Sequence, residues 1–320
     1  MPTVSILVPV YNEEQHLAAC LDSLLQQTLP AREIIVLFDE GSTDASLSIL
    51  QGYGNRIKLV RLPHSPISVA LNKGIALASG DIVFYAEADT FFDKKTIERA
   101  LPAFSAGDVG GVAILQEFKD ANTFFGKLQN DYQRVRNQWF LDGREPLTWC
   151  YFYRKTVLDK LRGFDESLLQ GEDQDLARQL RAAGYRILAI PGTLRWHAVS
   201  NSLSSPLSTL MTSFRTAYLH ALQSFSPQRV ALKMLFGALA IAGVAASLYT
   251  NSLLPLASVF FAAYLYFLGR LLPYHSMLST ISLSLIPGIA LVKSLSYFLG
   301  YSWGSLSKLV FPRARHSRGM

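Results

Sequence analysis

Short apolar runs alternate with helical patterns through the first two thirds of the chain. The apolar run at 4–10 ends at a turn and predicts a buried strand. Leucines recur at helical spacing between residues 16 and 27, and a β-branched run at 33–38 predicts a second strand. Further elements follow as strands at 57–62 and 81–85 and a helix at 68–78. This alternation predicts right-handed β-α-β units, and therefore an α/β fold with a mostly parallel sheet and flanking helices.

Polar clusters follow three of these predicted strands, after Val10, Phe38 and Tyr85. In a parallel sheet, ligands bind outside the carboxyl ends of the strands. The pattern beyond residue 96 is less regular. It predicts a strand at 109–116 and helices at 124–141 and 173–183. The polar clusters therefore predict a ligand site at one edge of the sheet.

The composition changes near residue 230, where acidic residues end and apolar stretches dominate. We divide the chain into residues 1–205, 206–228 and 229–320. Two stretches, 230–249 and 253–272, are long enough to span a bilayer, which needs about 20 apolar residues. Lys233 and Arg270 lie at the same end of the pair, as the positive-inside rule requires. The pattern predicts a transmembrane hairpin with its uncharged tip outside.

The segments flanking this hairpin allow more than one interpretation. Residues 208–225 predict an amphipathic helix, either in the membrane interface or against the core of the first part. Residues 277–311 predict an interfacial helix pair or two short crossings, because Pro287 and Lys293 interrupt the apolar pattern. Either arrangement keeps the basic tail inside, where anionic lipid headgroups suit it. We therefore expect a multi-pass protein of the cell membrane with its first part in the cytoplasm.

Charge and cysteine content narrow the function class. The net charge is +6, but the first part has no basic block with interleaved aromatics, so we expect no nucleic-acid partner. Cys20 and Cys150 are far apart and predict free buried thiols rather than a disulfide scaffold. The N-terminus runs directly into a strand pattern without a basic segment, so we predict no signal peptide.

A series of short motifs covers residues 3–200 in a fixed order. The motifs are Ile6-Leu7-Val8-Pro9-Val10-Tyr11-Asn12-Glu13, Phe38-Asp39-Glu40-Gly41-Ser42-Thr43-Asp44, Ala70-Leu71-Asn72-Lys73-Gly74, Ala78-Ser79-Gly80-Asp81, Glu87-Ala88-Asp89, Gly163-Phe164-Asp165-Glu166 and Gly171-Glu172-Asp173-Gln174-Asp175. Together they resemble the family 2 glycosyltransferases of GT-A fold, which are inverting, nucleotide-sugar-dependent enzymes. The resemblance implies a Rossmann-like GT-A catalytic domain over residues 1–205.

The resemblance also implies a donor pocket. In the family, the first carboxylate after the second strand contacts the nucleotide base, and Asp39 has that position here. A carboxylate can accept hydrogen bonds from the N–H donors of a base. The alternative for Asp39 is a turn or helix-capping residue. The remaining donor-binding candidates are Pro9, Tyr11, Glu13, Asn72, Lys73, Glu87 and Asp89.

Glu87-Ala88-Asp89 occupies the position of the family's metal motif. By resemblance Asp89 and His197 would hold a divalent cation, Mg²⁺ or Mn²⁺, and hard carboxylate oxygen suits these ions. Glu87 departs from the commoner aspartate by one methylene. The alternatives are solvated loop carboxylates and, for His197, a lone histidine packed under the membrane region.

The proton acceptor is expected at the start of the predicted helix that follows Gly171. Inverting transfer needs a base for the attacking hydroxyl, and the resemblance assigns Asp173 to that role with Glu172 in support. The alternative is a charged first helical turn that the helix dipole favours. On the acceptor side the candidates are Trp149, Asp175 and Trp196, and core packing is the alternative for Trp149.

The resemblance and these residues together imply a hexosyltransferase-type enzyme that moves a sugar from a UDP- or GDP-linked donor to a hydroxyl of a lipid-linked saccharide or glycolipid. A base-bearing site favours a hydroxyl acceptor, because a phosphate is already ionised. A polyprenyl-phosphate glycosyltransferase is the alternative enzyme. The alternative of another class is an inactive membrane scaffold that binds nucleotide-sugar, which the departures at Glu87 and Leu71 leave open.

Overall fold

The structure is a computed structural model. It describes residues 1–119, 124–143, 147, 149–168, 171–198 and 231–278, together with 285–286, 296, 299 and 301–303. The chain divides into two compact units, which are described separately. The first unit comprises Met1–Asp120 and Arg136–Ala198, and the second comprises Ala121–Val135 and Val199–Met320. The predicted amphipathic helix at 208–225, most of 277–311 and the basic tail lie outside the described residues.

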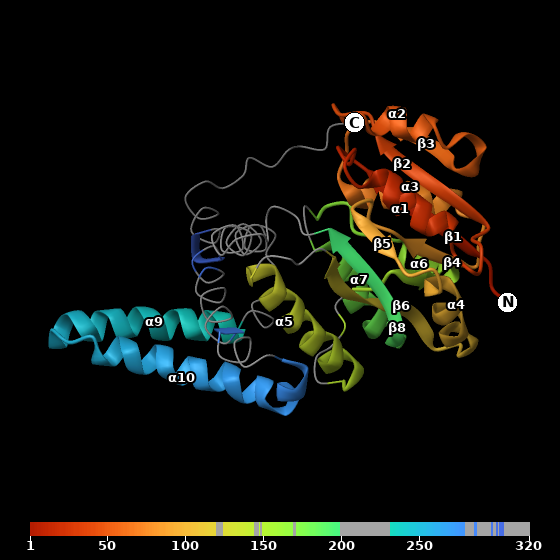
Figure 1. Cartoon of the computed structure of the whole chain (residues 1–320). Coiled ribbons are helices and arrows are strands. Elements are labelled where there is room, and N and C mark those ends of the chain that lie inside the picture. Colours follow the sequence, from red (N-terminus) through yellow and green to blue (C-terminus); the bar gives the residue numbers. More distant parts are fainter. Residues whose placement is uncertain are drawn as a thin grey trace. The chain divides into compact units, whose positions relative to one another are not determined.

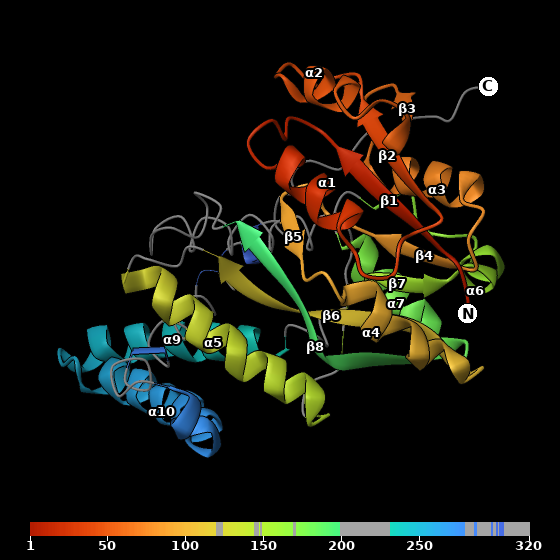
Figure 2. The ribbon, with the colours of Figure 1, turned by 45° about the vertical axis from the view of Figure 1, so that its right-hand side comes forward.

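The first unit is built on an eight-stranded sheet with the order β3-β2-β1-β4-β7-β6-β8-β5 (Figure 1). Its strands are β1 Val4–Val10, β2 Glu33–Asp39, β3 Lys58–Leu62, β4 Ile82–Tyr85, β5 Thr90–Phe92, β6 Val109–Lys119, β7 Phe152–Arg154 and β8 Arg186–Ala198. The first four strands are mutually parallel, and β6 runs parallel to β8 (Figure 2). Strand β7 is antiparallel to both of its neighbours, and β5 is antiparallel to β8.

Helices cover the sheet because its central strands are apolar on both faces. The helices of the first unit are α1 Leu17–Leu25, α2 Ser46–Gln51, α3 Ile67–Leu77, α4 Thr96–Ala100, α6 Lys155–Leu161 and α7 Glu172–Ala182. Helix α5, Phe124–Leu141, belongs to the second unit up to Val135 and to the first unit from Arg136. Along β1, Ile6 lies in one core cluster with Leu21 of α1, while Leu7 lies in another with Ile75 of α3. Burial on both faces explains why β1 reads as a continuous apolar run rather than an alternating one. It also brings the strand ends, where the polar clusters lie, to one edge.

The described part of the second unit contains a helical hairpin of α9, Ala231–Thr250, and α10, Leu254–Leu271. The two helices pack against each other (Figure 1). The turn that joins them includes Asn251, whose φ is 48°. The predicted stretches at 230–249 and 253–272 therefore do form helices. Among the residues that the structure describes, however, no helix combines the length and the apolarity that a membrane crossing requires. The predicted transmembrane hairpin is thus not supported.

Candidate active site

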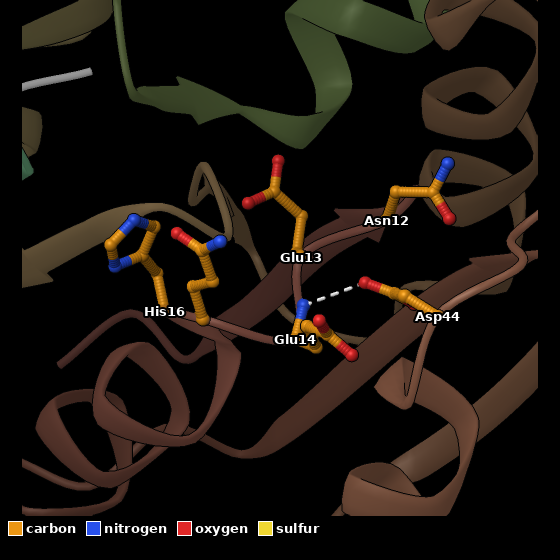
Figure 3. A pocket seen from close by; sticks show the side chains of 6 residues that line it. Asn12, Glu13, Glu14, His16 and Asp44 are labelled. Atoms are coloured by element: carbon orange, nitrogen blue, oxygen red, sulfur yellow. Dashed lines mark hydrogen bonds between the residues drawn. The ribbon is translucent and has the colours of Figure 1, made fainter. Parts of the chain in front are cut away.

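The loops that follow β1 and β2 are joined by hydrogen bonds at one edge of the sheet. Asn12 takes a left-handed backbone conformation, with φ of 54°, and its Oδ1 accepts a hydrogen bond from the backbone N–H of Thr43 at 2.8 Å. The Glu14 N–H donates to Asp44 Oδ2 at 2.9 Å (Figure 3), and the Ala45 N–H donates back to Glu14 Oε2 at 2.9 Å. These reciprocal bonds fix the two loops against each other, and with them the positions of the side chains they carry.

Asp39 lies at the end of β2 within this edge, and its side chain is only 15% exposed. The Gly41 N–H donates to Asp39 Oδ1 at 2.8 Å, and His64 Nδ1 lies 3.0 Å from Oδ2. The ring of Tyr11 stands 5.1 Å from that of His64. Asp39 and Tyr11 both lie beside His64, and Pro9 is half-buried on β1 two residues before Tyr11. Their binding of a donor stays a prediction. Sequence reasoning missed His64, for which the only signal was its place just after β3.

Glu13 projects from the same edge beside a hollow of about 320 Å³. The hollow is lined by Asn12, Glu13, Glu14, Gln15, His16 and Asp44. Figure 3 shows the Glu13 side chain pointing away from the Glu14–Asp44 pair. Burial raises the pKa of Glu13 to about 7, and the nearby charges of Asp89, Asp44 and Glu87 add to the shift. The Glu13 carboxylate therefore belongs to a group of mutually repelling acids at the carboxyl ends of β1, β2 and β4.

Glu87 and Asp89 follow β4, and both are half-buried. The Tyr151 hydroxyl donates to Glu87 Oε2 at 3.0 Å, and the Thr90 hydroxyl lies 3.4 Å from Asp89 Oδ1. The Glu87 carbonyl accepts the Cys20 thiol at 3.4 Å. The loop that carries the two carboxylates is thus held from the helix side by Cys20 and from the sheet side by Tyr151.

These carboxylates fit a divalent cation by the chemistry of their oxygens. Mg²⁺ and Mn²⁺ prefer hard oxygen ligands, and Mg²⁺ usually takes one or two carboxylates with the rest of its shell from water or phosphate. Within the described ranges, three or more potential ligands among histidine, cysteine, aspartate and glutamate do not gather into a metal-holding group. Glu87 and Asp89 therefore suit a cation whose remaining ligands come from a bound diphosphate.

Strand β8 places two further candidates at the level of this loop. Its backbone pairs His197 with Thr90, the residue after Asp89, and Trp196 with Phe91. The side chains of Trp196 and His197 lie outside the described part of the structure. The register thus brings the His197 backbone next to the metal motif, and its role as a ligand stays a prediction.

The start of α7 carries the second group of acids. Gly171, with φ of 83°, precedes Glu172 and Asp173 in the first turn. Burial raises the pKa of Asp173 to about 7, with the charges of Glu172 and Glu87 adding to it. Burial and the Glu87 charge likewise raise the pKa of Glu172. Both α7 carboxylates thus lie close enough to Glu87 to feel its charge.

Tyr85 marks where the two acidic groups meet. Its ring stacks on that of Tyr151 with the centroids 6.1 Å apart. Burial raises its pKa well above the ordinary value, and the charges of Glu87, Glu172 and Asp173 contribute to that shift. The end of β4 and the start of α7, distant in sequence, therefore converge around one buried phenol.

The side-chain amide of Asn72 makes its hydrogen bonds to the loop at 163–166, although the sequence predicted that it binds the nucleotide-sugar. Its Nδ2 donates to the Phe164 carbonyl and to Glu166 Oε1, both at 2.9 Å, while its Oδ1 accepts the Phe164 N–H at 2.8 Å. The amide thus ties α3 to the loop at 163–166. The neighbouring Lys73 is exposed on α3. Donor binding by these two residues stays a prediction, and the structure gives Asn72 a clear structural role.

Two acceptor-side candidates are also held by their own surroundings. Asp175 accepts hydrogen bonds from Arg178 and from Gln179 Nε2, both on its own helix. Trp149 packs edge-on against Phe140, with the ring centroids 4.9 Å apart. Its indole N–H is buried and has no hydrogen-bond partner among the residues that the structure describes. The structure thus does not bring Asp175 or Trp149 to the Glu87–Asp173 region by any direct contact that it describes.

The comparison with known families agrees with this geometry. Residues 5–162, which carry β1 to β7, Asp39, Glu87 and Asp89, match the family described as Glycosyl transferase family 2. The chain contains a family 2 glycosyltransferase domain. The predicted glycosyltransferase class is thereby confirmed.

Relatives and solved structures support the same family. The chain is 31% identical over 173 residues to EpsH of Bacillus subtilis (strain 168), a protein assigned to the glycosyltransferases, covering 50% of this chain and 49% of EpsH. It is 28% identical over 193 residues to a chondroitin synthase of Escherichia coli, covering 58% of this chain and 27% of that protein. The chain thus spans half or less of the length of these relatives.

A solved mannosyltransferase from Pyrobaculum calidifontis, PcManGT, shares the fold. It superposes with a TM-score of 0.58 at 19% identity, covering 98% of this chain and 88% of the other. That structure holds GDP-Man and Mn²⁺. At this identity the likeness establishes the fold alone, which confirms the predicted GT-A-like architecture.

Proposed function

We propose that this protein transfers a sugar from a nucleotide-diphosphate sugar to an acceptor hydroxyl with inversion, as an enzyme of glycan biosynthesis. The observation that carries the proposal is the convergence of the loop after β4 and the start of α7 around Tyr85. The proposal is supported because Asp173, which would act as the proton acceptor, lies near Glu87, whose loop would face the diphosphate.

The raised pKa of Asp173 supports its proposed role as the general base. A base works best when its pKa lies near the operating pH, and the pKa of Asp173 is raised to about 7. It is then largely ionised just above neutrality and strong enough to take the proton of an attacking hydroxyl. The Glu172 carboxylate beside it helps to set this pKa through its charge. A phosphate acceptor would need no such group, so the polyprenyl-phosphate alternative leaves Asp173 without a function.

The donor would lie along the carboxyl edge of the sheet. Asp39 would accept a hydrogen bond from the nucleotide base, beside the Tyr11 ring. Glu87 and Asp89 would face the diphosphate through a divalent cation, which supplies positive charge where the leaving group gains negative charge. Mn²⁺ in the PcManGT structure is in keeping with such a cation. An inactive scaffold would keep these groups but would not need a base with a raised pKa.

We also propose that the α9–α10 hairpin attaches the protein to the surface of a membrane, with the catalytic domain on the cytoplasmic side. Large apolar side chains near the hairpin tip are exposed, namely Leu248, Tyr249, Leu253 and Leu254, at 72–92%. Apolar side chains at this exposure favour burial in the headgroup and acyl boundary of a bilayer. A lipid-linked saccharide or glycolipid is the acceptor that such attachment favours.

Calorimetric titration with nucleotide-sugars tests the proposed donor site. UDP- and GDP-linked hexoses are titrated in the presence of Mn²⁺ against the wild type, Asp39→Ala and Asp89→Ala. We expect saturable binding by the wild type, weaker binding by Asp39→Ala, and loss of the Mn²⁺-dependent part in Asp89→Ala with the fold retained by circular dichroism. Unchanged titrations in both variants would contradict the proposed site. If the protein bound a donor specifically but transferred its sugar to none of a wide range of hydroxyl acceptors, the inactive nucleotide-sugar-binding scaffold would be the better interpretation.

A further inference from the structure

Asp39, which is proposed above to accept a hydrogen bond from the nucleotide base, already contacts a neighbouring side chain through both of its oxygens. His64 Nδ1 lies 3.1 Å from Asp39 Oδ1 and 3.0 Å from Oδ2. Because an ionised carboxylate can only accept hydrogen bonds, Nδ1 carries the proton and donates it between the two oxygens. The Gly41 N–H takes a further position on Oδ1 at 2.8 Å, and the Ser65 N–H approaches Oδ2 at the longer distance of 3.5 Å.

The position of His64 depends on the bare backbone at Gly41. A Cβ atom at Gly41 would stand 3.0 Å from both Asp39 Oδ1 and His64 Nδ1, and 3.1 Å from His64 Cβ. These distances are tighter than ordinary van der Waals contact, so a side chain at this position would make His64 or the Asp39 carboxylate shift by a few tenths of an ångström and would disturb their contact. The imidazole side chain is 66% exposed, and its ring stands 5.1 Å from that of Tyr11, so a ligand can reach both rings.

The bridge limits which base Asp39 can accept. A carboxylate offers about four lone-pair sites, and His64 and Gly41 occupy the two-oxygen edge and one side of Oδ1. Only Oδ2 keeps room for a further strong donor, in place of the long Ser65 contact. Uracil presents a single N–H donor between two carbonyl acceptors, which this oxygen can satisfy. Guanine presents adjacent N–H and NH₂ donors that pair with both oxygens at once, and His64 stands in that position.

We propose that His64 is a specificity-determining residue that makes the donor site select uracil over guanine. The proposal rests on the function proposed above, in which Asp39 meets the nucleotide base. It adds a residue that no sequence motif singled out, and it names the donor class as a uridine diphosphate sugar. Unless His64 moves away, guanine loses one of its two hydrogen bonds to Asp39, and a buried polar group without its partner weakens binding.

Competitive nucleotide titration tests this selection. The dissociation constants of UDP and GDP are measured with Mn²⁺ for the wild type, His64→Ala, Gly41→Ala and Arg61→Ala. Arg61→Ala is the matched control. Arg61 pairs with Glu40, just after the neighbouring strand, at 2.9 Å, so its replacement removes a positive charge near the site without changing a contact to Asp39. We expect the wild type to prefer UDP by at least about tenfold, the usual worth of one hydrogen bond to a charged group. In His64→Ala and Gly41→Ala this preference should fall, mainly through tighter GDP binding, while Arg61→Ala should keep the wild-type ratio.

The outcomes separate this proposal from the one on which it rests. A wild type that prefers GDP, or an unchanged UDP/GDP ratio in both His64→Ala and Gly41→Ala, overturns the role of His64 and leaves the donor site standing. A wild type that binds neither nucleotide, or an Asp39→Ala variant that binds UDP as well as the wild type, overturns the proposed donor site itself. Gly41→Ala disturbs the contact between His64 and Asp39 without removing the imidazole, so it answers the question even if His64→Ala folds poorly.

Discussion

The hydroxyl of Tyr151 donates a hydrogen bond to Glu87 Oε2 at 3.0 Å. Tyr151 is 4% exposed and immediately precedes β7, while Glu87 belongs to the loop after β4. An aspartate at this position would be shorter by one methylene, so the extra length of Glu87 is used to reach the buried phenol that immediately precedes β7. Glu87, which stands where the family's metal motif more often has aspartate, thus has a hydrogen-bond partner in the Tyr151 hydroxyl.

The hydroxyl of Tyr151 should matter for transfer more than for stability. Tyr151→Phe removes the bond to Glu87 but keeps the ring that stacks on Tyr85. A hydrogen bond to a charged group is worth about 1.5–3 kcal/mol, so we expect single-turnover transfer to fall by roughly 10- to 100-fold. Tyr53→Phe is the control, because its hydroxyl donates to the Ala18 carbonyl at 2.9 Å, outside the site. Equal losses in the two variants would show that Glu87 does not need this bond.

Asp173 should be separable from Asp175 two residues along the same helix. Asp173→Asn keeps size and hydrogen bonding but cannot take a proton at neutral pH. We expect turnover to fall by on the order of 10² to 10⁴ while donor affinity changes little. Asp175→Asn alters a side chain bound to Arg178 and Gln179, so its turnover should stay near the wild type. Near-normal transfer by Asp173→Asn would make a phosphate acceptor the better interpretation, and lost donor binding would make Asp173 structural.

Activity should rise with pH through about 7, the raised pKa of Asp173. Only the ionised carboxylate accepts a proton, so turnover should climb about tenfold per pH unit below this value and level off above it. The pH profile of turnover under donor saturation measures this. A flat profile between about pH 5 and 8 would contradict the assignment of the base.

Stability should change with pH in the opposite direction. The folded state holds the Asp173 proton more tightly than the unfolded chain, because its pKa is raised from 3.8 to about 7. The free energy of unfolding should therefore fall as the pH rises from about 4 to about 7, and the loss should be complete above that window. Asp173→Asn removes this term, so its stability relative to the wild type should increase across the same window in urea titrations.

Asn72 and Gly163 should couple in stability. Gly163 has φ of +72°, and a Cβ there would stand 2.2 Å from Asn72 Oδ1. Asn72→Ala removes three hydrogen bonds to the loop at 163–166, and we expect a loss of about 1–3 kcal/mol. Gly163→Ala adds both backbone strain and the clash, but in the Asn72→Ala background only the strain remains. The double variant should lose less than the sum of the singles. Additive losses in urea unfolding would show that the two residues do not meet.

The hairpin tip should control membrane attachment. Leu253 and Leu254 are 77% and 72% exposed, and exchanging both for glutamine removes apolar surface worth about 1.5–3 kcal/mol per side chain if buried. We expect the double variant to sediment less with vesicles of phosphatidylcholine and phosphatidylglycerol than the wild type does. Lys58→Gln, an exposed change on β3, is the control for altered surface polarity. A wild type that stays in the supernatant would refute the attachment.

Much of the fold follows from local sequence patterns. The apolar run at 4–10 and the helical pattern at 124–141 coincide with β1 and α5. The strand ends predicted the edge where Asp39, Glu87 and Asp89 lie. The pattern also predicted the α9 and α10 helices, but its prediction that they cross a membrane is not supported, since no helix among the described residues meets that requirement.

The tertiary structure alone decided the partners of the site residues. His64 and Asp39 are 25 positions apart, Tyr151 and Glu87 are 64 apart, and Asn72 and Phe164 are 92 apart. Periodicity reports which face of an element is buried, but it carries no information on which loops meet across a sheet. That depends on the strand order, in which β7 pairs with β4 although 66 residues separate Tyr85 and Phe152. The sequence therefore determined which acids stand at the strand ends, and the packing of the sheet determined which neighbours bind them and raise their pKa values.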